Sequence, residues 1–255
     1  MKKILLLTIA ILGVVALGCF GWMCFFSTSN PHDYPTIGSI PTPAGYHRVK
    51  GKDIAYAKYL RALPLKKRGS KVRLYLGGIA IPQSVNYAVV DMPLLSNAEQ
   101  CADVCMRLRA EYLYKAGKPI KFQDVHGNTR HYEGGASRKE FEKYLRSLYQ
   151  VASTFSMCRE MKTRPLADMQ PGDVFVFPAR NRHSLGHAMM VVDVAVNKRG
   201  EKVYMLAEGS TPARSIHIVW NVQSVWRTPW FTLDETSKRI FASVCFYKPS
   251  DLRHF

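Results

Sequence analysis

Acidic residues are scarce in this chain of 255 residues, where 19 Asp and Glu stand against 36 Lys and Arg and leave a formal net charge of +17. Such an imbalance favours anionic partners: nucleic acid, anionic lipid headgroups or an acidic cell-wall polymer. The basic residues are scattered, which indicates a solvated positive surface rather than a groove-reading helix. They include Lys66, Lys67, Arg68, Arg107, Arg109, Lys162, Arg164, Arg180, Arg182, Lys198 and Arg199.

Closely spaced cysteine pairs of the Cys-x-x-Cys type, which would indicate a metal site, are also missing. Cys101, Cys105, Cys158 and Cys245 lie outside the N-terminal segment. They could form two disulfides in an oxidising compartment, or they could stay buried free thiols. Internal repeats and low-complexity runs are not evident either. We predict neither a cofactor nor a metal.

Charge and proline are absent from Ile4 to Phe26, a run of 23 residues that follows Lys2 and Lys3. This length can span a hydrocarbon core of ~30 Å and exceeds a secretory core of roughly 7–15 residues. The pattern therefore predicts an uncleaved signal-anchor over residues 1–26. The alternative is a lipoprotein signal that ends at Gly18 and Cys19.

Both alternatives place the rest of the chain outside the cytoplasm, since Lys2 and Lys3 would stay inside. We therefore expect a protein whose body lies outside the cytoplasm, in the cell envelope, and which contacts the membrane through its N-terminal segment. This location excludes nucleic acid as a partner and leaves peptidoglycan or another anionic envelope polymer.

Residues 27–45 contain four prolines among Ser, Thr and Gly, which is typical of a semi-extended tether. Residues 46–255 then read as a single α+β domain, in which an antiparallel sheet packs against helices. The central helix is predicted over residues 97–116, with Ser96 as N-cap and Glu99 completing a capping box. Further helices are expected over residues 53–63 and from Ser137 onward. Strands are expected over 72–76, 85–92, 119–124, 129–132, 202–208, 216–220 and 240–247, with the strand over 85–92 central in the sheet.

The segment from Gly172 to Asp193 reads as a strand, an irregular loop and a second strand that opens on His187. The turn Asn197–Gly200 would join this second strand to the strand that ends at Glu208. If Val196 faces Glu201, Met189 faces Glu208, and His187 then lies diagonally beside Glu208 on one face. A slip of one residue would remove this arrangement.

A histidine beside a carboxylate is half of a system that activates a nucleophile. Cys101 is the candidate nucleophile because it lies in the early part of a capped helix, although its place in the second turn weakens the dipole effect. His187 would have to supply most of the activation, with Glu208 as its orienting partner. Gln100 could form an oxyanion hole together with a backbone N–H.

Structural roles remain open for the same residues. Cys101 could be an inert thiol on the apolar helix face, His187 could bond a loop carbonyl, and Glu208 could pair with Arg214. A metal site of His183, His187 and Glu208 is a weaker alternative, since the H-x-x-x-H spacing suits a helix and this segment is a loop. His217 reads as structural, and the aromatic residues Trp220, Trp226, Trp230 and Phe231 read as core or cleft wall rather than a sugar-stacking platform.

Two resemblances emerge from these residues. Cys101 on a helix, Gly186-His187-Ala188 at a strand start and Glu208 on the next strand resemble papain-like cell-wall hydrolases of the NlpC/P60 and CHAP types. An uncharacterised bacterial envelope family, the domain of unknown function 4846, is resembled by several longer stretches: Tyr59–Leu65, Gln100–Asp103 with Arg107–Tyr112, Gly186–Ala188, and Ser215–Ile218 followed by Pro229-Trp230.

The first resemblance implies a papain-like fold and a cysteine hydrolase or acyltransferase that acts on amide bonds of the cell wall. The catalytic residues would be Cys101, His187, Glu208 and Gln100. The second resemblance implies no activity. The alternative function is a non-catalytic envelope module that binds wall polymer or a protein partner through its basic surface.

Overall fold

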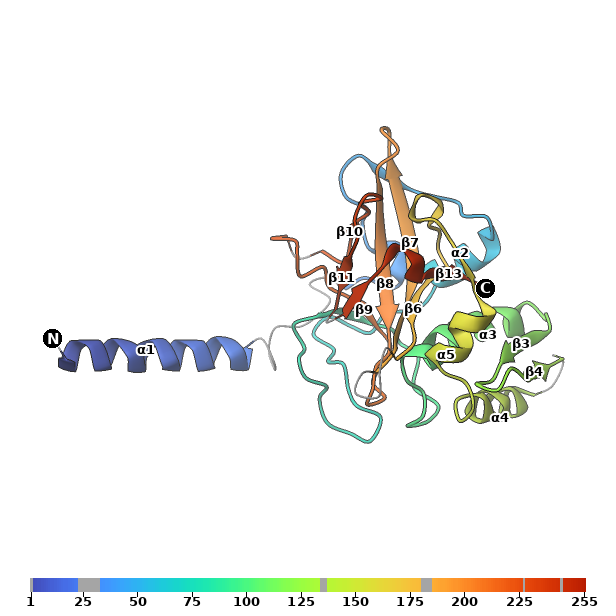
Figure 1. Ribbon diagram of the computed structural model, residues 1–255, viewed down its shortest axis with the longest axis horizontal. Coiled ribbons are helices and arrows are strands. Elements are labelled where there is room, and N and C mark those ends of the chain that lie inside the picture. Colours follow the sequence, from blue (N-terminus) through green and yellow to red (C-terminus); the bar gives the residue numbers. More distant parts are fainter. Residues whose placement is uncertain (1, 23–32, 134–136, 180–184, 227, 244) are drawn as a thin grey trace.

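The computed structural model describes residues 2–22, 33–133, 137–179, 185–226, 228–243 and 245–255. It shows an α+β domain built on a nine-stranded sheet in which every pairing is antiparallel, as predicted (Figure 1). The order along the sheet is β2-β9-β8-β7-β6-β13-β5, with β1 paired to β7 and β10 paired to β8.

The N-terminal helix α1 covers Lys2–Gly21 and exposes large apolar side chains such as Leu12 and Leu17. In the part of the chain that the structure describes, no helix combines the length and apolar character that crossing a membrane requires. The membrane-spanning helix predicted over Ile4 to Phe26 is therefore not found. The described helix ends at Gly21, and residues 23–26 lie outside the described ranges.

Strands β7 and β8 form the middle of the sheet and its longest hairpin. The other strands are short, and β3 with β4 and β11 with β12 make two separate hairpins. The strand bounds are β1 Tyr46–Arg48, β2 Asn86–Val89, β3 Ile120–Gln123, β4 Thr129–Tyr132, β5 Lys162–Thr163, β6 Val174–Phe177, β7 His187–Asn197, β8 Lys202–Glu208, β9 His217–Val219, β10 Phe231–Thr232, β11 Ile240–Ala242, β12 Cys245–Tyr247 and β13 Leu252–His254.

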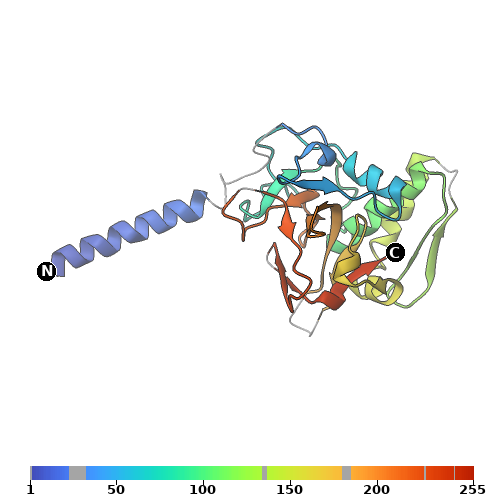
Figure 2. The ribbon, with the colours of Figure 1, turned by 90° about the horizontal axis from the view of Figure 1, so that it is seen from above.

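The described residues of the domain form four α-helices. They are α2 Ile54–Arg61, α3 Cys101–Lys115, α4 Arg138–Leu148 and α5 Thr154–Glu160. The capping box of α4 forms as predicted, because the backbone N–H of Glu140 bonds the Ser137 hydroxyl and the backbone N–H of Ser137 bonds the Glu140 carboxylate. Figure 2 shows α2, α3 and α4 (cyan to yellow-green) on the side of the domain opposite the N-terminal helix α1, whereas α5 (yellow) lies beside the red C-terminal strand β13.

The central helix α3 begins four residues later than predicted. The carboxylate of Glu99 is buried and engaged elsewhere, with Arg107 at 2.7 Å and the backbone N–H of Leu95 at 2.6 Å, so it cannot close a box with Ser96. Gln100 takes the N-cap position, and its backbone N–H donates to Asp103 at 2.9 Å. Cys101 is consequently the first residue of the helix, and its predicted place in the second turn is wrong.

The hairpin of β7 and β8 contains a β-bulge between Val191 and Asp193. Nearest the turn, Val196 faces Lys202, so its predicted pairing with Glu201 is wrong. Beyond the bulge Met190 faces Ala207, which is the predicted register. A bulge adds one residue to one strand and so shifts the pairing by one residue. The predicted register therefore holds at the end of the hairpin that contains His187 and Glu208, although it fails next to the turn.

Asp193 anchors this bulge. Its carboxylate is fully buried and forms ion pairs with Arg48 at 2.6 Å and Arg61 at 2.7 Å, and it also accepts the N–H of Val194 at 2.9 Å. Buried charges of this kind are tolerated only when they are paired. The pairs tie β7 to β1 and α2 at the point where the register changes.

Both faces of the sheet are buried, which explains the almost continuous apolar sequence of β7. Met190 and Val192 pack into the larger core cluster, which also contains residues of α3. Met189, Val191 and Val194 pack into the second cluster, under the C-terminal strands. Residues two apart on a strand normally face the same side of the sheet. Val192 and Val194 face opposite sides because the bulge between Val191 and Asp193 interrupts this alternation.

Three strand predictions were wrong. The segment over 72–76 makes only isolated bridges at Arg73 and Leu74. β2 ends the main strand order and pairs with β9 alone, rather than being central. The run over 240–247 forms two strands with a turn at Ser243, where φ is +54°.

Candidate functional site

The candidate site lies where the start of α3, the start of β7 and the end of β8 meet. Gly209 permits the contact between β8 and α3, because a Cβ there would lie 2.6 Å from Val104 Cγ2 and 3.3 Å from the carbonyl oxygen of Gln100. Gly186, just before His187, permits a different close contact, with the end of β6, since its Cβ would lie 2.7 Å from the carbonyl oxygen of Phe177. The residues next to Glu208 and His187 thus pack closely against α3 and β6.

Glu208 is the centre of the polar cluster, and its side chain is buried, with 3% of the residue exposed. Nε2 of His187 lies 2.7 Å from one carboxylate oxygen. The other oxygen accepts from Nε2 of His217 at 3.2 Å and from the hydroxyl of Ser243 at 2.8 Å. Burial alone would raise the pKa of Glu208, but the hydrogen bonds and charges of His187 and His217 hold that pKa far below its usual 4.5. The carboxylate is therefore ionised.

His187 is oriented by this carboxylate. Because Glu208 accepts from Nε2, the proton of the neutral ring is on that nitrogen, and Nδ1 is left available to the Cys101 sulfur. Burial lowers the pKa of His187, but hydrogen bonds to Cys101 and Glu208 and the charges of the same two groups raise it well above 6.5. An imidazole in this setting holds a proton readily.

Cys101 contributes the sulfur from the first position of α3. The residue is 6% exposed, whereas Cys105, one turn further, is fully buried and has a pKa raised well above 9 by its burial. All five described cysteines are free thiols: Cys19, Cys101, Cys105, Cys158 and Cys245. Its first-turn position places the Cys101 sulfur near the positive end of the helix dipole.

A cavity of about 270 Å³ opens beside Cys101. Gln100 lines it, and the side-chain oxygen of Gln100 accepts from the Thr211 hydroxyl at 2.7 Å, which turns the amide NH₂ group away from Thr211. Asp103 lines the cavity as well, and burial raises its pKa to about 7. The remaining lining residues are Ala98, Ala102, Tyr149, Ala152, Ser153, Thr154, Leu185 and Gly186.

The structure thus brings together all four predicted site residues. The ion pairs of Glu208 within the described chain are with His187 and His217 and do not include the suggested Arg214. Arg107 is not a surface residue, because it is buried between Glu99 and Glu111. His183, Arg180 and Arg182 lie outside the described residues, and in the described ranges no group of three or more His, Cys, Asp or Glu side chains is arranged so that it could hold a metal ion.

His217 and Ser243 are the site residues that the sequence did not reveal. His217 faces Glu208 directly across β8 and β9, and its other ring nitrogen bonds the carbonyl oxygen of Ser215 at 2.9 Å. Alternation along residues 216–219 could have placed His217 on the face of Glu208, had the register of β9 been known. Ser243 is held in the left-handed region by a turn that no local pattern predicts.

Stability should depend on pH through this cluster. The lowered pKa of Glu208 contributes stability above about pH 4.5 that is lost as the pH falls. The raised pKa of His187 contributes stability that is complete below about pH 6.5 and is lost as the pH rises through the folded-state value. We expect Glu208→Gln to lower the free energy of unfolding by about 2–3 kcal/mol between these limits. Denaturant titrations of the wild type and the Glu208→Gln variant from acidic to alkaline pH measure the difference in their free energies of unfolding. This difference should become smaller toward both ends of the pH range.

Comparison with known proteins gives one result. A family model described as "Domain of unknown function (4846)" matches residues 38–135 and 125–253. This match confirms the family predicted from the longer stretches. Searches of curated proteins and of solved structures found no match.

Proposed function

Since the chain belongs to the family of the domain of unknown function 4846, a description that names no activity, we propose its function from the residues around Cys101. We propose a cysteine hydrolase or acyltransferase that acts on amide bonds of the cell wall. The carrying observation is the arrangement of three side chains: His187 Nε2 lies 2.7 Å from the buried carboxylate of Glu208, and Cys101 lies near enough to His187 to raise its pKa. It joins a nucleophile, a base and an orienting group.

The proposed reaction has two steps. The Cys101 thiolate attacks the amide carbonyl carbon, and imidazolium His187 protonates the leaving amine as the C–N bond breaks and a thioester forms. Water then attacks the thioester while His187 accepts its proton, and the acid and the free thiol are released. An incoming amine in place of water would give acyl transfer.

The charge that develops on the carbonyl oxygen needs donors. The backbone N–H of Cys101 is suited to this, because the first residue of a helix has no carbonyl partner within the helix. The NH₂ group of Gln100 is the second donor, with its orientation set by Thr211. Gln100 and Cys101 line the same cavity, where the scissile amide would enter.

The arrangement of the chain supports a papain-like fold. Cys101 begins a helix packed on the sheet, His187 begins a strand, and Glu208 ends the neighbouring strand. For location, Lys2 and Lys3 followed by an apolar helix support export to the bacterial envelope and attachment there through the N-terminal segment. Attachment through a lipid on Cys19, after cleavage behind Gly18, is the alternative to an uncleaved anchor.

The test is digestion of purified peptidoglycan by the full-length chain. We expect soluble muropeptides with newly formed amino groups, detected by mass spectrometry. A complete lack of amide cleavage and of amide exchange with an added amine would contradict the proposal.

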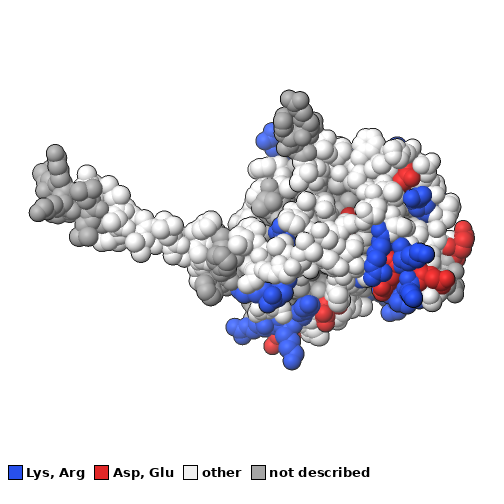
Figure 3. Space-filling model, turned by 90° about the horizontal axis from the view of Figure 1, so that it is seen from below, with Lys and Arg blue, Asp and Glu red and all other residues white. Residues whose placement is uncertain are grey.

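A second candidate is a non-catalytic module that binds an acidic wall polymer, favoured by the charge of +17. On the face in Figure 3, basic side chains form separate groups, several with acidic side chains beside them. Binding through such a surface should weaken strongly as salt rises. It should also be unchanged by Cys101→Ala, which separates it from the thiol chemistry.

A further inference from the structure

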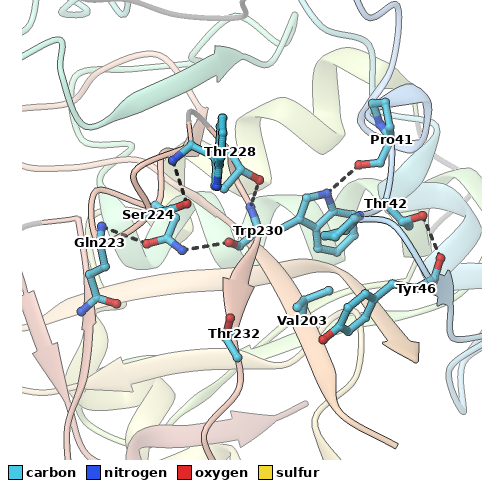
Figure 4. Close-up of a pocket in the computed structure, with 12 residues that line it drawn as sticks. Pro41, Thr42, Tyr46, Val203, Gln223, Ser224, Thr228, Trp230 and Thr232 are labelled. Carbon is cyan, nitrogen blue, oxygen red and sulfur yellow. Dashed lines mark hydrogen bonds between the residues drawn. The ribbon is translucent and has the colours of Figure 1, made fainter. Parts of the chain in front are cut away.

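A second cavity, of about 590 Å³, is larger than the one beside Cys101. It is formed by strands β1, β8 and β10 and the segments before β1 and β10, and we call it the tryptophan pocket (Figure 4). Its lining residues share one property: none of those that the structure describes is charged, in a protein of charge +17. They are Pro41, Thr42, Pro43, Tyr46, Val203, Asn221, Gln223, Ser224, Trp226, Thr228, Trp230 and Thr232.

The wall of the tryptophan pocket is held by a network of hydrogen bonds. Nε1 of Trp230 donates to the carbonyl oxygen of Pro41 at 2.7 Å, which links the segment before β10 to the segment before β1. Asn221 donates to the carbonyl oxygen of Trp230 at 2.9 Å and accepts the backbone N–H of Gln223 at 3.1 Å. The Thr228 hydroxyl accepts the backbone N–H of Trp230 at 3.2 Å. The pocket is therefore pre-formed, as ligand sites usually are.

Several groups in the pocket are left for a ligand. Trp226 is 78% exposed, unlike Trp230, which is 4% exposed. Within the described residues, no hydrogen bond engages the side-chain amide of Gln223 or the hydroxyl groups of Tyr46 and Thr232. Figure 4 shows Trp230, Tyr46 and Val203 close together, with Gln223 across from them.

We propose that the tryptophan pocket binds an uncharged saccharide segment. An aromatic ring offers a flat apolar face for the C–H face of a sugar ring, and side-chain amides and hydroxyls both donate and accept the hydrogen bonds that sugar hydroxyls need. The described lining residues offer amide, hydroxyl and aromatic groups, none of them charged. An apolar ligand would leave these polar groups without partners.

This site is separate from the chemistry at Cys101. Val203, in the pocket, precedes Glu208 by five residues on β8, which corresponds to ~17 Å along an extended strand. Saccharide binding therefore does not depend on the proposed thiol reaction.

A lipid surface is the competing occupant, because Val222 and Val225 are exposed near Trp226. Val225, at 94% exposed, does not line the pocket. The lining itself combines one exposed indole with amide and hydroxyl groups, which suits a saccharide better than acyl chains.

The test is calorimetric titration of the full-length chain, kept in a detergent without a sugar headgroup, with N-acetylated chitotetraose as the uncharged saccharide. We expect saturable binding that Trp226→Ala weakens at least 10-fold and Gln223→Ala weakens less. Trp22→Ala, which removes an indole that is 57% exposed on the N-terminal segment, is the matched control and should bind like the wild type. Cys101→Ala should also bind like the wild type, whether or not the chain cleaves peptidoglycan.

Three results would overturn the inference. The first is that chitotetraose does not bind detectably. The second is that the Trp226→Ala variant binds chitotetraose as tightly as the wild type. The third is that zwitterionic lipid vesicles bind in a way that requires Trp226 while chitotetraose does not bind.

Discussion

Replacing Cys101 with alanine should reduce the release of muropeptides by ~10⁴-fold or more, since the loss of a catalytic nucleophile commonly has effects of this size. The thiolate is the atom that forms the covalent thioester, and alanine offers no substitute. Folding should be nearly unchanged, because only one sulfur atom is removed at the edge of a cavity. The measurement is the initial rate of muropeptide release by each protein at equal concentration.

Cys105→Ala is the matched control for this variant. Cys105 lies on the same helix, one turn further, and is fully buried in the core. We expect it to lower stability slightly and to leave the rate per folded molecule intact. Equal rates from wild type and the Cys101→Ala variant would contradict the proposed chemistry.

Replacing Glu208 should produce the largest combined effect on stability and rate. Glu208→Ala leaves His187, His217 and Ser243 without their shared acceptor, and breaking a buried ion pair in this way costs about 3–5 kcal/mol. Glu208→Gln keeps the volume but cannot hold the imidazolium of His187, so we expect the rate to fall ~10²–10⁴-fold. The first effect is measured by chemical denaturation and the second by muropeptide release.

Asp193→Asn separates the two effects. Asp193 is another fully buried carboxylate, on the same strand as His187, and its partners are Arg48 and Arg61. We expect a loss of stability comparable to that of Glu208→Gln, with the rate per folded molecule retained. If the two variants lose activity equally per folded molecule, Glu208 has only a structural role.

The α+β class and most helices were predictable because their signals are local. Ser137 and Glu140 cap α4 by bonds to their own backbone, and nothing distant competes for them. Ser96 and Glu99 form the same sequence pattern before α3, but Arg107 and the backbone of Leu95 bind the carboxylate. A tertiary contact therefore overrode a local signal, and the start of the helix moved to Cys101.

The contact between His187 and Glu208 was predictable because the two residues lie on adjacent strands of one hairpin, whose turn sets the pairing of the strands. The prediction missed the bulge and misplaced the pairs next to the turn, yet the bulge restored the expected register near Glu208. His217 and Ser243 reach the same carboxylate from nine and 35 positions away in sequence. Contacts of this kind depend on the packing of separate strands, which no single stretch of sequence determines.

The most direct test of the Cys101–His187 pair is the rate at which iodoacetamide modifies each cysteine of the native full-length chain near neutral pH. An imidazolium beside the sulfur favours the reactive thiolate, so we expect Cys101 to be modified and Cys105 to stay protected until the chain is denatured. His187→Ala should slow the modification of Cys101 by ~10-fold or more. Modification of Cys101 only after denaturation, or at the same rate in the His187→Ala variant, would show that the sulfur is not activated by His187.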